Sequence, residues 1–171
     1  MKKTFVILSF FVFLIGCTSV NSGKESEKTA VIPQPVSVTE GSGEFTVTPG
    51  MKVYAAAEAE KAAKFLIEDF RLAGGFTLKR AANAEEAAIC FVLSEEALPA
   101  EKGKEAYTLD VSADSVRIAA GDAAGFFYGY QTLKQLLPVE IYGGTVQAGV
   151  SWTVPAVSIE DWPRFKWRGL M

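Results

Sequence analysis

The chain has 171 residues, 49% of them hydrophobic and 22% charged, a composition close to that of a folded globular domain. Its formal net charge of -3 leaves no strongly basic character, so nucleic acid is not an expected partner. The sequence contains no histidine, which excludes Ser-His-Asp and Cys-His catalytic arrangements and histidine-ligated zinc sites. We expect neither a metal site nor a cofactor.

The N-terminus has the layout of an export signal. Lys2 and Lys3 precede an apolar run over residues 5–15, which is shorter than the roughly 20 residues of a membrane-spanning helix. The run ends in Leu-Ile-Gly-Cys, which resembles the lipobox of bacterial lipoproteins and implies cleavage before Cys17 and lipid on its thiol. We therefore expect residues 1–17 to be a lipoprotein signal peptide. The protein would be anchored to the outer membrane through Cys17, facing the periplasm or the cell exterior; ordinary secretion is the alternative.

Residues 18–30 are polar and lack an apolar period, which is typical of a flexible tether. If Cys17 carries lipid, Cys90 has no disulfide partner, because the chain has two cysteines. Cys90 lies in the apolar run 88–93, where burial as a small hydrophobic residue is the expectation. Without a histidine to activate it, a catalytic thiol is disfavoured.

The first elements of the folded part are predicted strands. Residues 36–39 and 44–48 alternate apolar and polar side chains around Gly41-Ser42-Gly43, a pattern that predicts a hairpin, and residues 52–55 form a further strand. The glycines do not suggest a nucleotide-binding loop, because a third glycine in register and a following helix are both missing.

A helix is predicted over residues 55–73, ending at Gly74 and Gly75. Its apolar face consists of Ala59, Ala62, Leu66, Phe70 and Ala73. Strands are then expected at 76–79, 88–94, 107–111 and 116–119, with a turn at 112–115.

A second helix is predicted from Asp122, a suitable N-cap, to Leu137, where Pro138 stops it. Its buried stripe is Phe126, Tyr130, Leu133 and Leu137. The aromatic residues 126–130 are interpreted as core rather than as a sugar-stacking surface, and Gly125 and Gly129 indicate close packing on a sheet.

A last strand at 154–159 completes one domain over residues 31–163. The expected fold class is α+β, with a mainly antiparallel sheet and two helices packed on one face. Asp110 and Asp114 could be imagined as an acid/base pair, but their spacing across a turn favours surface residues.

Three segments resemble the N-terminal region of family 20 glycoside hydrolases, the β-N-acetylhexosaminidases. They are Val31-Ile32-Pro33-Gln34-Pro35, residues 122–136 (DAAGFFYGYQTLKQL) and residues 157–171 (VSIEDWPRFKWRGLM). The resemblance covers residues 31–171 and implies that an α+β domain precedes a (β/α)8 barrel, with residues 164–171 as the start of that barrel.

The resemblance also implies a role for Arg168, which stands before Gly169 and would bind hydroxyls of the terminal sugar; spacing alone favours a surface arginine. The family removes terminal N-acetylglucosamine or N-acetylgalactosamine from glycans. It uses a retaining mechanism in which the substrate's acetamido oxygen is the nucleophile and an Asp-Glu pair assists. A barrel typically needs about 250 residues. That pair would therefore lie beyond Met171, and we expect this chain alone to be inactive, with no catalytic residue of its own.

Two alternatives remain open from the sequence. One is the front domain of an O-GlcNAcase-type enzyme of family 84, which carries a similar Tyr-Gly-x-Gln-Thr-Leu helix, although Leu170-Met171 after the Arg-Gly pair favours family 20. The other is a self-contained, lipid-anchored module that binds glycans or serves a structural role.

Overall fold

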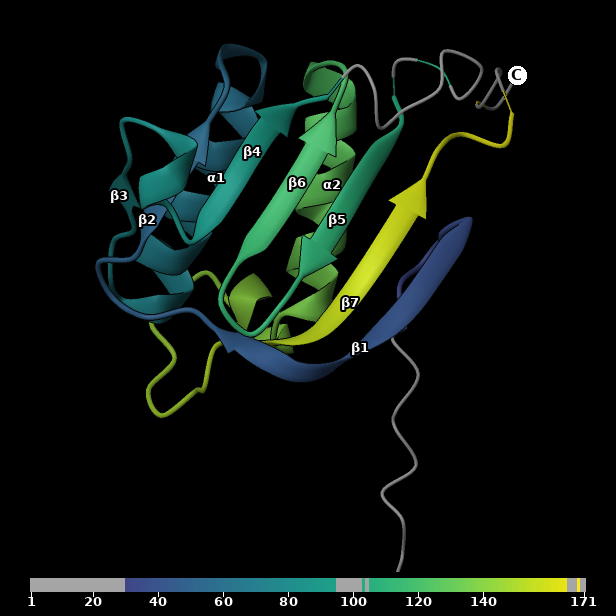
Figure 1. Cartoon of the computed structure of the whole chain (residues 1–171). Coiled ribbons are helices and arrows are strands. Elements are labelled where there is room, and N and C mark those ends of the chain that lie inside the picture. The colour runs from purple at the N-terminus through teal and green to yellow at the C-terminus, as the bar shows by residue number, and fades with distance from the viewer. Residues whose placement is uncertain (1–29, 95–102, 104, 166–168, 170–171) are drawn as a thin grey trace, which may run out of the picture.

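The computed structural model describes residues 30–94, 103, 105–165 and 169. Within these residues a seven-stranded sheet has the order β1-β7-β5-β6-β4-β2-β3. The strands are β1 Ser37–Thr46, β2 Lys52–Ala55, β3 Lys79–Arg80, β4 Ile89–Leu93, β5 Tyr107–Val111, β6 Val116–Ala120 and β7 Thr153–Asp161. The helices α1 Glu60–Asp69 and α2 Ala123–Leu136 lie side by side on one face of the sheet (Figure 1). The α+β class, with two helices on one face, is confirmed.

The sheet is mixed rather than mainly antiparallel. Strands β1, β7, β5 and β6 pair antiparallel, whereas β4 runs parallel to both β6 and β2, and β3 runs parallel to β2. Parallel neighbours require a long crossover connection. Here α1 is that connection, because it carries the chain from the end of β2 back to the start of β3 and β4.

Helix α1 has the predicted buried stripe. A 3₁₀ turn at Ala57–Ala59 leads into it, and a single π turn at Phe70–Gly74 ends it. Gly75 follows with φ of 72°, a left-handed conformation that favours glycine. The five residues of the predicted apolar face, Ala59, Ala62, Leu66, Phe70 and Ala73, are all buried in the main core.

Helix α2 begins where the sequence predicts. One carboxylate oxygen of Asp122 accepts hydrogen bonds of 3.0 Å from the backbone N–H groups of Ala124 and Gly125. The expected stripe of Phe126, Tyr130, Leu133 and Leu137 is buried. The helix lies tightly on β5 and β6, since a Cβ atom at Gly129 would be 2.6 Å from the Ile118 side chain.

Two local predictions were wrong. The segment around Gly41-Ser42-Gly43 is a bulge inside the continuous strand β1 and not a hairpin turn, because β7 pairs with β1 on both sides of it. Residues 76–78 precede β3 and do not form a strand with Lys79. Leu78 is buried, and the Phe76 ring contacts Phe70 with centroids 5.5 Å apart, so the apolar pattern there records core packing without strand pairing.

Candidate functional site

The two site residues predicted from sequence, Cys17 and Arg168, lie outside the described residues, so their roles remain predictions. The structure does describe Asp110 and Asp114, the pair considered as acid and base. Asp110 is exposed on β5, pairs in register with Arg117 and accepts a 2.6 Å hydrogen bond from the Ser158 hydroxyl. Asp114 lies in the turn that follows β5, as expected of a surface turn residue.

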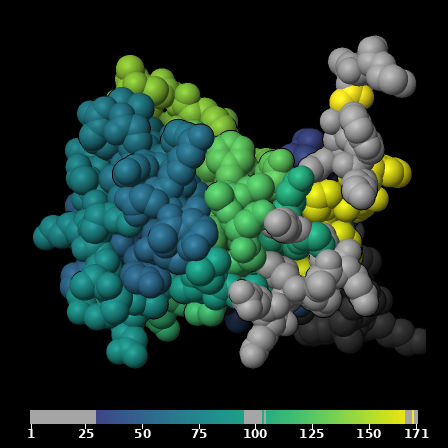
Figure 2. All heavy atoms as spheres, turned by 90° about the horizontal axis from the view of Figure 1, so that it is seen from above, coloured from purple at the N-terminus to yellow at the C-terminus, as the bar shows by residue number. Residues whose placement is uncertain are grey.

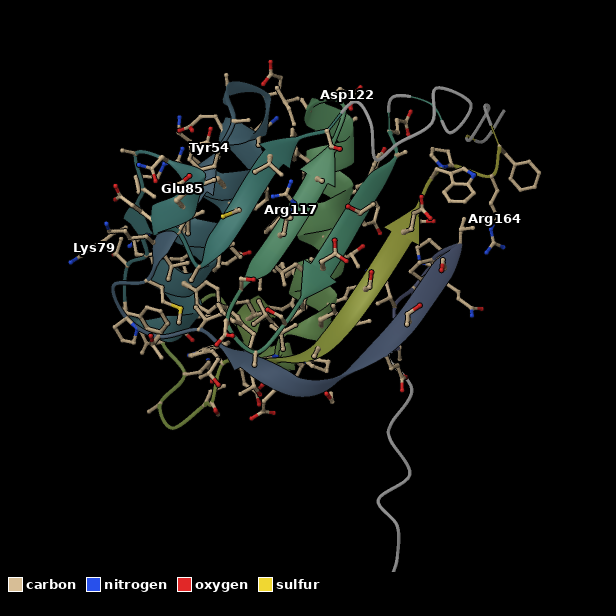
Figure 3. All side chains as sticks on the ribbon, viewed as in Figure 1. Tyr54, Lys79, Glu85, Arg117, Asp122 and Arg164 are labelled. Atoms are coloured by element: carbon tan, nitrogen blue, oxygen red, sulfur yellow. The ribbon has the colours of Figure 1, made fainter. Side chains whose placement is uncertain are left out.

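Cys90 is buried, as predicted. Its side chain is 9% exposed, and its sulfur lies 3.4 Å from the backbone oxygens of both Ala84 and Ala87. Burial raises the pKa of the Cys90 thiol, and the nearby charge of Arg117 lowers it in part. A protonated, enclosed thiol is suited to packing and not to nucleophilic attack. Arg117 of β6 is the register partner of Cys90 on β4, and its side chain lies on the sheet face opposite the helices (Figure 3).

A groove of about 460 Å³ lies where the start and the end of the described domain meet. Its walls come from the segment before β1, from the start of β5 and the residues before it, from α2, and from the end of β7 and the segment after it. They are Val31, Ile32, Pro33, Gln34, Glu105, Tyr107, Tyr128, Gln131, Thr132, Gln135, Asp161, Trp162, Pro163, Arg164 and Phe165. Figure 2 looks onto this end of the molecule, where a hollow lies between α2 (green) and the segment that follows β7 (yellow).

Hydrogen bonds fix the segment before β1 against the other walls of this groove. The Gln135 side chain pairs with the backbone of Ile32, accepting from its N–H at 2.9 Å and donating to its carbonyl at 3.0 Å. The Asp161 carboxylate accepts from the N–H of Val36 at 3.2 Å. In the segment that follows β7, the Arg164 guanidinium, labelled in Figure 3, donates to the Gln34 carbonyl at 3.4 Å.

Buried hydroxyls lie at the groove between β5 and α2. The hydroxyl oxygens of Tyr107 and Thr132 are 2.6 Å apart. Burial raises the pKa of Tyr107 to about 12; the hydrogen bond to Thr132 opposes this shift and the Asp161 carboxylate adds to it. A phenol that keeps its proton at neutral pH is a hydrogen-bonding group here, not a base.

A second hollow of about 330 Å³ lies on the outer side of the two helices. Its walls are Lys61, Ala62, Ala123, Ala124, Phe127 and Tyr128. Phe127 and Tyr128 are 38% and 37% exposed, so the prediction that the whole aromatic run 126–130 is core was wrong for these two. Phe126 and Tyr130 are buried, as predicted.

Among the residues that the structure describes, no three Asp, Glu or Cys side chains come close enough together to hold a metal ion. The same part of the chain contains no helix with the length and apolar character needed to cross a bilayer.

The groove residues were not singled out as a site from sequence, because the contact between Gln135 and Ile32 joins positions 103 residues apart.

Comparison with known proteins gives a consistent assignment. The sequence model of glycosyl hydrolase family 20, domain 2, matches residues 28–162. A β-hexosaminidase of Porphyromonas gingivalis is 34% identical over 143 residues, which are 82% of this chain and 18% of that protein. A β-N-acetylhexosaminidase of Cellulomonas fimi is 35% identical over 145 residues, 82% of this chain and 27% of that protein.

A solved structure agrees with these sequence matches. The Streptomyces plicatus N-acetyl-β-hexosaminidase, solved in complex with Thio-NAglucal, superimposes with a TM-score of 0.72 at 36% identity, covering 81% of this chain and 27% of that one. The chain therefore spans about a quarter or less of the length of these relatives. The family match covers most of the chain, and this protein belongs to glycosyl hydrolase family 20, of which it carries domain 2.

Proposed function

We propose that this chain is the non-catalytic N-terminal domain of an exo-acting β-N-acetylhexosaminidase, which removes terminal N-acetylglucosamine or N-acetylgalactosamine from glycans. The match of domain 2 to residues 28–162 carries the proposal. The relatives support it, since proteins named as β-hexosaminidases match this chain over 82% of its length and are several times longer.

The catalytic chemistry would reside in a (β/α)8 barrel that begins at residues 164–171. In this proposal Arg168 binds hydroxyls of the terminal sugar, and an Asp-Glu pair after Met171 orients the substrate's acetamido group and serves as general acid/base. The mechanism would be retaining, with the acetamido oxygen as nucleophile.

The geometry of the domain supports a non-catalytic role for the chain itself. The carboxylate of Asp161 is engaged by the Val36 N–H. Asp110 is engaged by Ser158 on the exposed face of the sheet, away from the groove. A general acid/base pair must flank one substrate bond. Asp110 and Asp114, the pair considered from the sequence, are not placed in this way at the groove, because neither of them lines it.

The enzymatic part of the proposal is tested with a polypeptide extended past Met171 through a complete barrel. It should hydrolyse an aryl N-acetyl-β-glucosaminide and leave the matching aryl β-glucoside intact, because the glucoside lacks the acetamido nucleophile. Proton NMR should show the β-anomer forming first. Equal turnover of both substrates, or initial release of the α-anomer, would contradict the mechanism.

We also propose that Cys17 carries lipid and anchors the protein to the outer membrane. The lipobox-like sequence that ends at Cys17 supports this. Expression with Cys17→Ser should move the protein from the membrane fraction to the soluble fraction. Unchanged membrane association would contradict lipidation at this residue. Cys90→Ser is the matched control, because that thiol is buried in the folded domain.

A further inference from the structure

The connection from α2 to β7 carries large apolar side chains that face the solvent. Val139 is 75% exposed, Val146 is 64% exposed and Tyr142 is 53% exposed. Among the large apolar residues that the structure describes outside the groove, these are the three most exposed. We call them the end patch. Exposed apolar residues that gather in one short segment mark an interaction site more often than scattered ones do.

The end patch lies at the C-terminal ends of both helices. The Lys134 ammonium, in the last turn of α2, stands 4.8 Å from the centre of the Tyr142 ring. The N–H of Gln147 donates a 2.8 Å hydrogen bond to the carbonyl of Ala73, which places the neighbouring Val146 beside the end of α1. The connection projects from the lower end of the molecule in Figure 1, where it is yellow-green. It therefore forms a surface separate from the two hollows, which it does not line.

This connection is free of charged side chains over residues 141–152, and Glu140 precedes that stretch. The nearest cation beneath the end patch, Lys134, is neutralised by the Asp69 carboxylate at 2.8 Å. Charged groups are costly to move into a lipid environment, whereas uncharged apolar groups are not. Tyrosine is enriched where a membrane meets water, because its ring is apolar and its hydroxyl is polar. The composition of the connection therefore favours contact with lipid.

The chain enters the fold at the same end of the helical layer. Val31 is buried in the main core, and the backbone of the next residue pairs with the side chain of Gln135, in the last turn of α2. The sequence predicts that residues 18–30, which separate this point from Cys17, are a tether. An unstructured chain of that length spans ~20 Å on average. Lipid on Cys17 would therefore hold this end of the domain close to the bilayer.

We propose that the end patch inserts into the headgroup region of the membrane to which Cys17 anchors the protein. This inference rests on the proposed lipid on Cys17. The anchor keeps the end patch at high effective concentration beside the bilayer, so the contact needs little affinity of its own. Insertion fixes the orientation of the domain. The C-terminal ends of α1 and α2 face the membrane, and the opposite end, where both helices begin, points away from it.

Photo-crosslinking with mass spectrometry tests the proposal. The probe p-benzoylphenylalanine, placed at Ala148, is exposed in the uncharged connection and attaches to C–H groups that lie next to it. The chain of 171 residues is expressed with its N-terminal signal and reconstituted in vesicles of phosphatidylethanolamine and phosphatidylglycerol. Irradiation should attach phospholipid to the peptide that contains position 148. The same probe at Glu58, exposed just before α1 at the opposite end, should give at least ~5-fold less phospholipid adduct.

A pair of variants identifies the end patch as the contact. Val146→Glu should lower the phospholipid adduct at position 148 at least ~5-fold, because it places a charge in the lipid interface. Leu93→Glu is the matched control, since it adds the same charge at a residue that is 47% exposed at the other end of the domain, and it should leave the adduct unchanged. Both residues are exposed, so neither variant should shift the urea midpoint. An unchanged adduct in Val146→Glu would overturn the proposal.

The mass of the peptide that contains Cys17 separates this inference from the proposed lipidation. Acyl groups on Cys17 without a phospholipid adduct at position 148 would overturn the inference and leave the anchor standing. An adduct at position 148 without acyl groups on Cys17 would support the lipid contact and overturn the anchor, and the absence of both would overturn both. An adduct to a second copy of the chain, or to the barrel in the extended polypeptide, would assign the end patch to a protein contact and overturn the inference.

Discussion

The hydroxyl oxygens of Tyr107 and Thr132 lie 2.6 Å apart, with the two side chains 3% and 4% exposed. Tyr107 is the first residue of β5 and Thr132 lies on α2, so this hydrogen bond joins the sheet to the helical layer at the groove. A buried polar pair is stable while both members keep their partner and becomes costly when one is lost or ionised.

The position of Tyr107 predicts alkaline unfolding. Burial raises its pKa from 10.0 to about 12, so between these values the folded chain keeps a proton that the unfolded chain has lost. The contribution of Tyr107 to the free energy of unfolding is therefore fully present below pH 10. It falls as the pH rises toward 12, by up to ~1.4 kcal/mol per pH unit. Urea unfolding at a series of alkaline pH values should show this fall.

Two variants check that Tyr107 is responsible. Tyr107→Phe should lower the free energy of unfolding at neutral pH by ~1 kcal/mol through the lost hydrogen bond, and should make its alkaline dependence shallower. Thr132→Val keeps the buried phenol and should retain the steep dependence. Equal slopes in wild type and Tyr107→Phe would contradict this account. Burial also raises the pKa of Tyr130, so some slope should remain in both variants.

The close packing of α2 on the sheet predicts that position 129 does not tolerate a side chain larger than that of glycine. A Cβ atom there would lie 2.6 Å from the Ile118 side chain and 3.2 Å from the Tyr107 ring, so Gly129→Ala should destabilise the domain by about 2 kcal/mol despite alanine's higher helix propensity. Gly121→Ala is the control, because nothing lies within 4 Å of that position. Thermal and urea unfolding measure both variants. If Gly129→Ala matched Gly121→Ala in stability, α2 would not lie as close to the sheet as described.

The ion pair between Asp69 and Lys134 should contribute to holding α1 against α2. Their side chains are 16% and 15% exposed, the atoms are 2.8 Å apart, and Asp69 also accepts the Tyr130 hydroxyl. Asp69→Asn leaves the Lys134 charge partly buried without its counterion and should cost about 2 kcal/mol.

The neighbouring residue is a matched control for that change. Glu68 pairs with Arg71 at 2.6 Å, but both side chains are about half exposed, so Glu68→Gln should leave the urea midpoint unchanged. If Glu68→Gln lost as much stability as Asp69→Asn, burial would not determine how much the Asp69–Lys134 ion pair contributes to stability.

Burial of Cys90 predicts slow thiol chemistry. In a chain carrying Cys17→Ser, a thiol-specific reagent at mildly alkaline pH should label the folded protein at least ~10-fold more slowly than the urea-unfolded protein, because the thiol is enclosed and its pKa is raised. Absorbance of the released chromophore follows the reaction. Rapid and complete labelling of the folded chain would mean that β4 is more open than described.

The helices could be predicted from the sequence because the residues that determine a helix lie close together along the chain. Leu66 and Phe70 repeat at the spacing that places them on one face of α1, and Asp122 provides the oxygen that the first turn of α2 needs. Gly125 and Gly129 likewise indicate close approach to a sheet, which the structure confirms through the short distances at both positions.

Strand pairing could not be predicted in the same way, because it joins distant residues. Ser37 of β1 pairs with Glu160 of β7, and nothing in either segment specifies the other. Gly41-Ser42-Gly43 fits a bulge as well as a turn, so the choice depended on that partner strand. The exposure of Phe127 and Tyr128 could not be predicted from periodicity either. Periodicity places an aromatic residue on a helix, but it does not say whether the core of the domain covers that residue.

The chain belongs to glycosyl hydrolase family 20, and we propose that it has no catalytic groups of its own. The most direct test is a turnover assay of the purified chain of 171 residues on an aryl N-acetyl-β-glucosaminide, beside the polypeptide extended through the barrel. We predict release of the aryl group by the extended polypeptide and none above the buffer rate by the chain alone. Steady hydrolysis by the chain alone, abolished by unfolding it, would contradict the account.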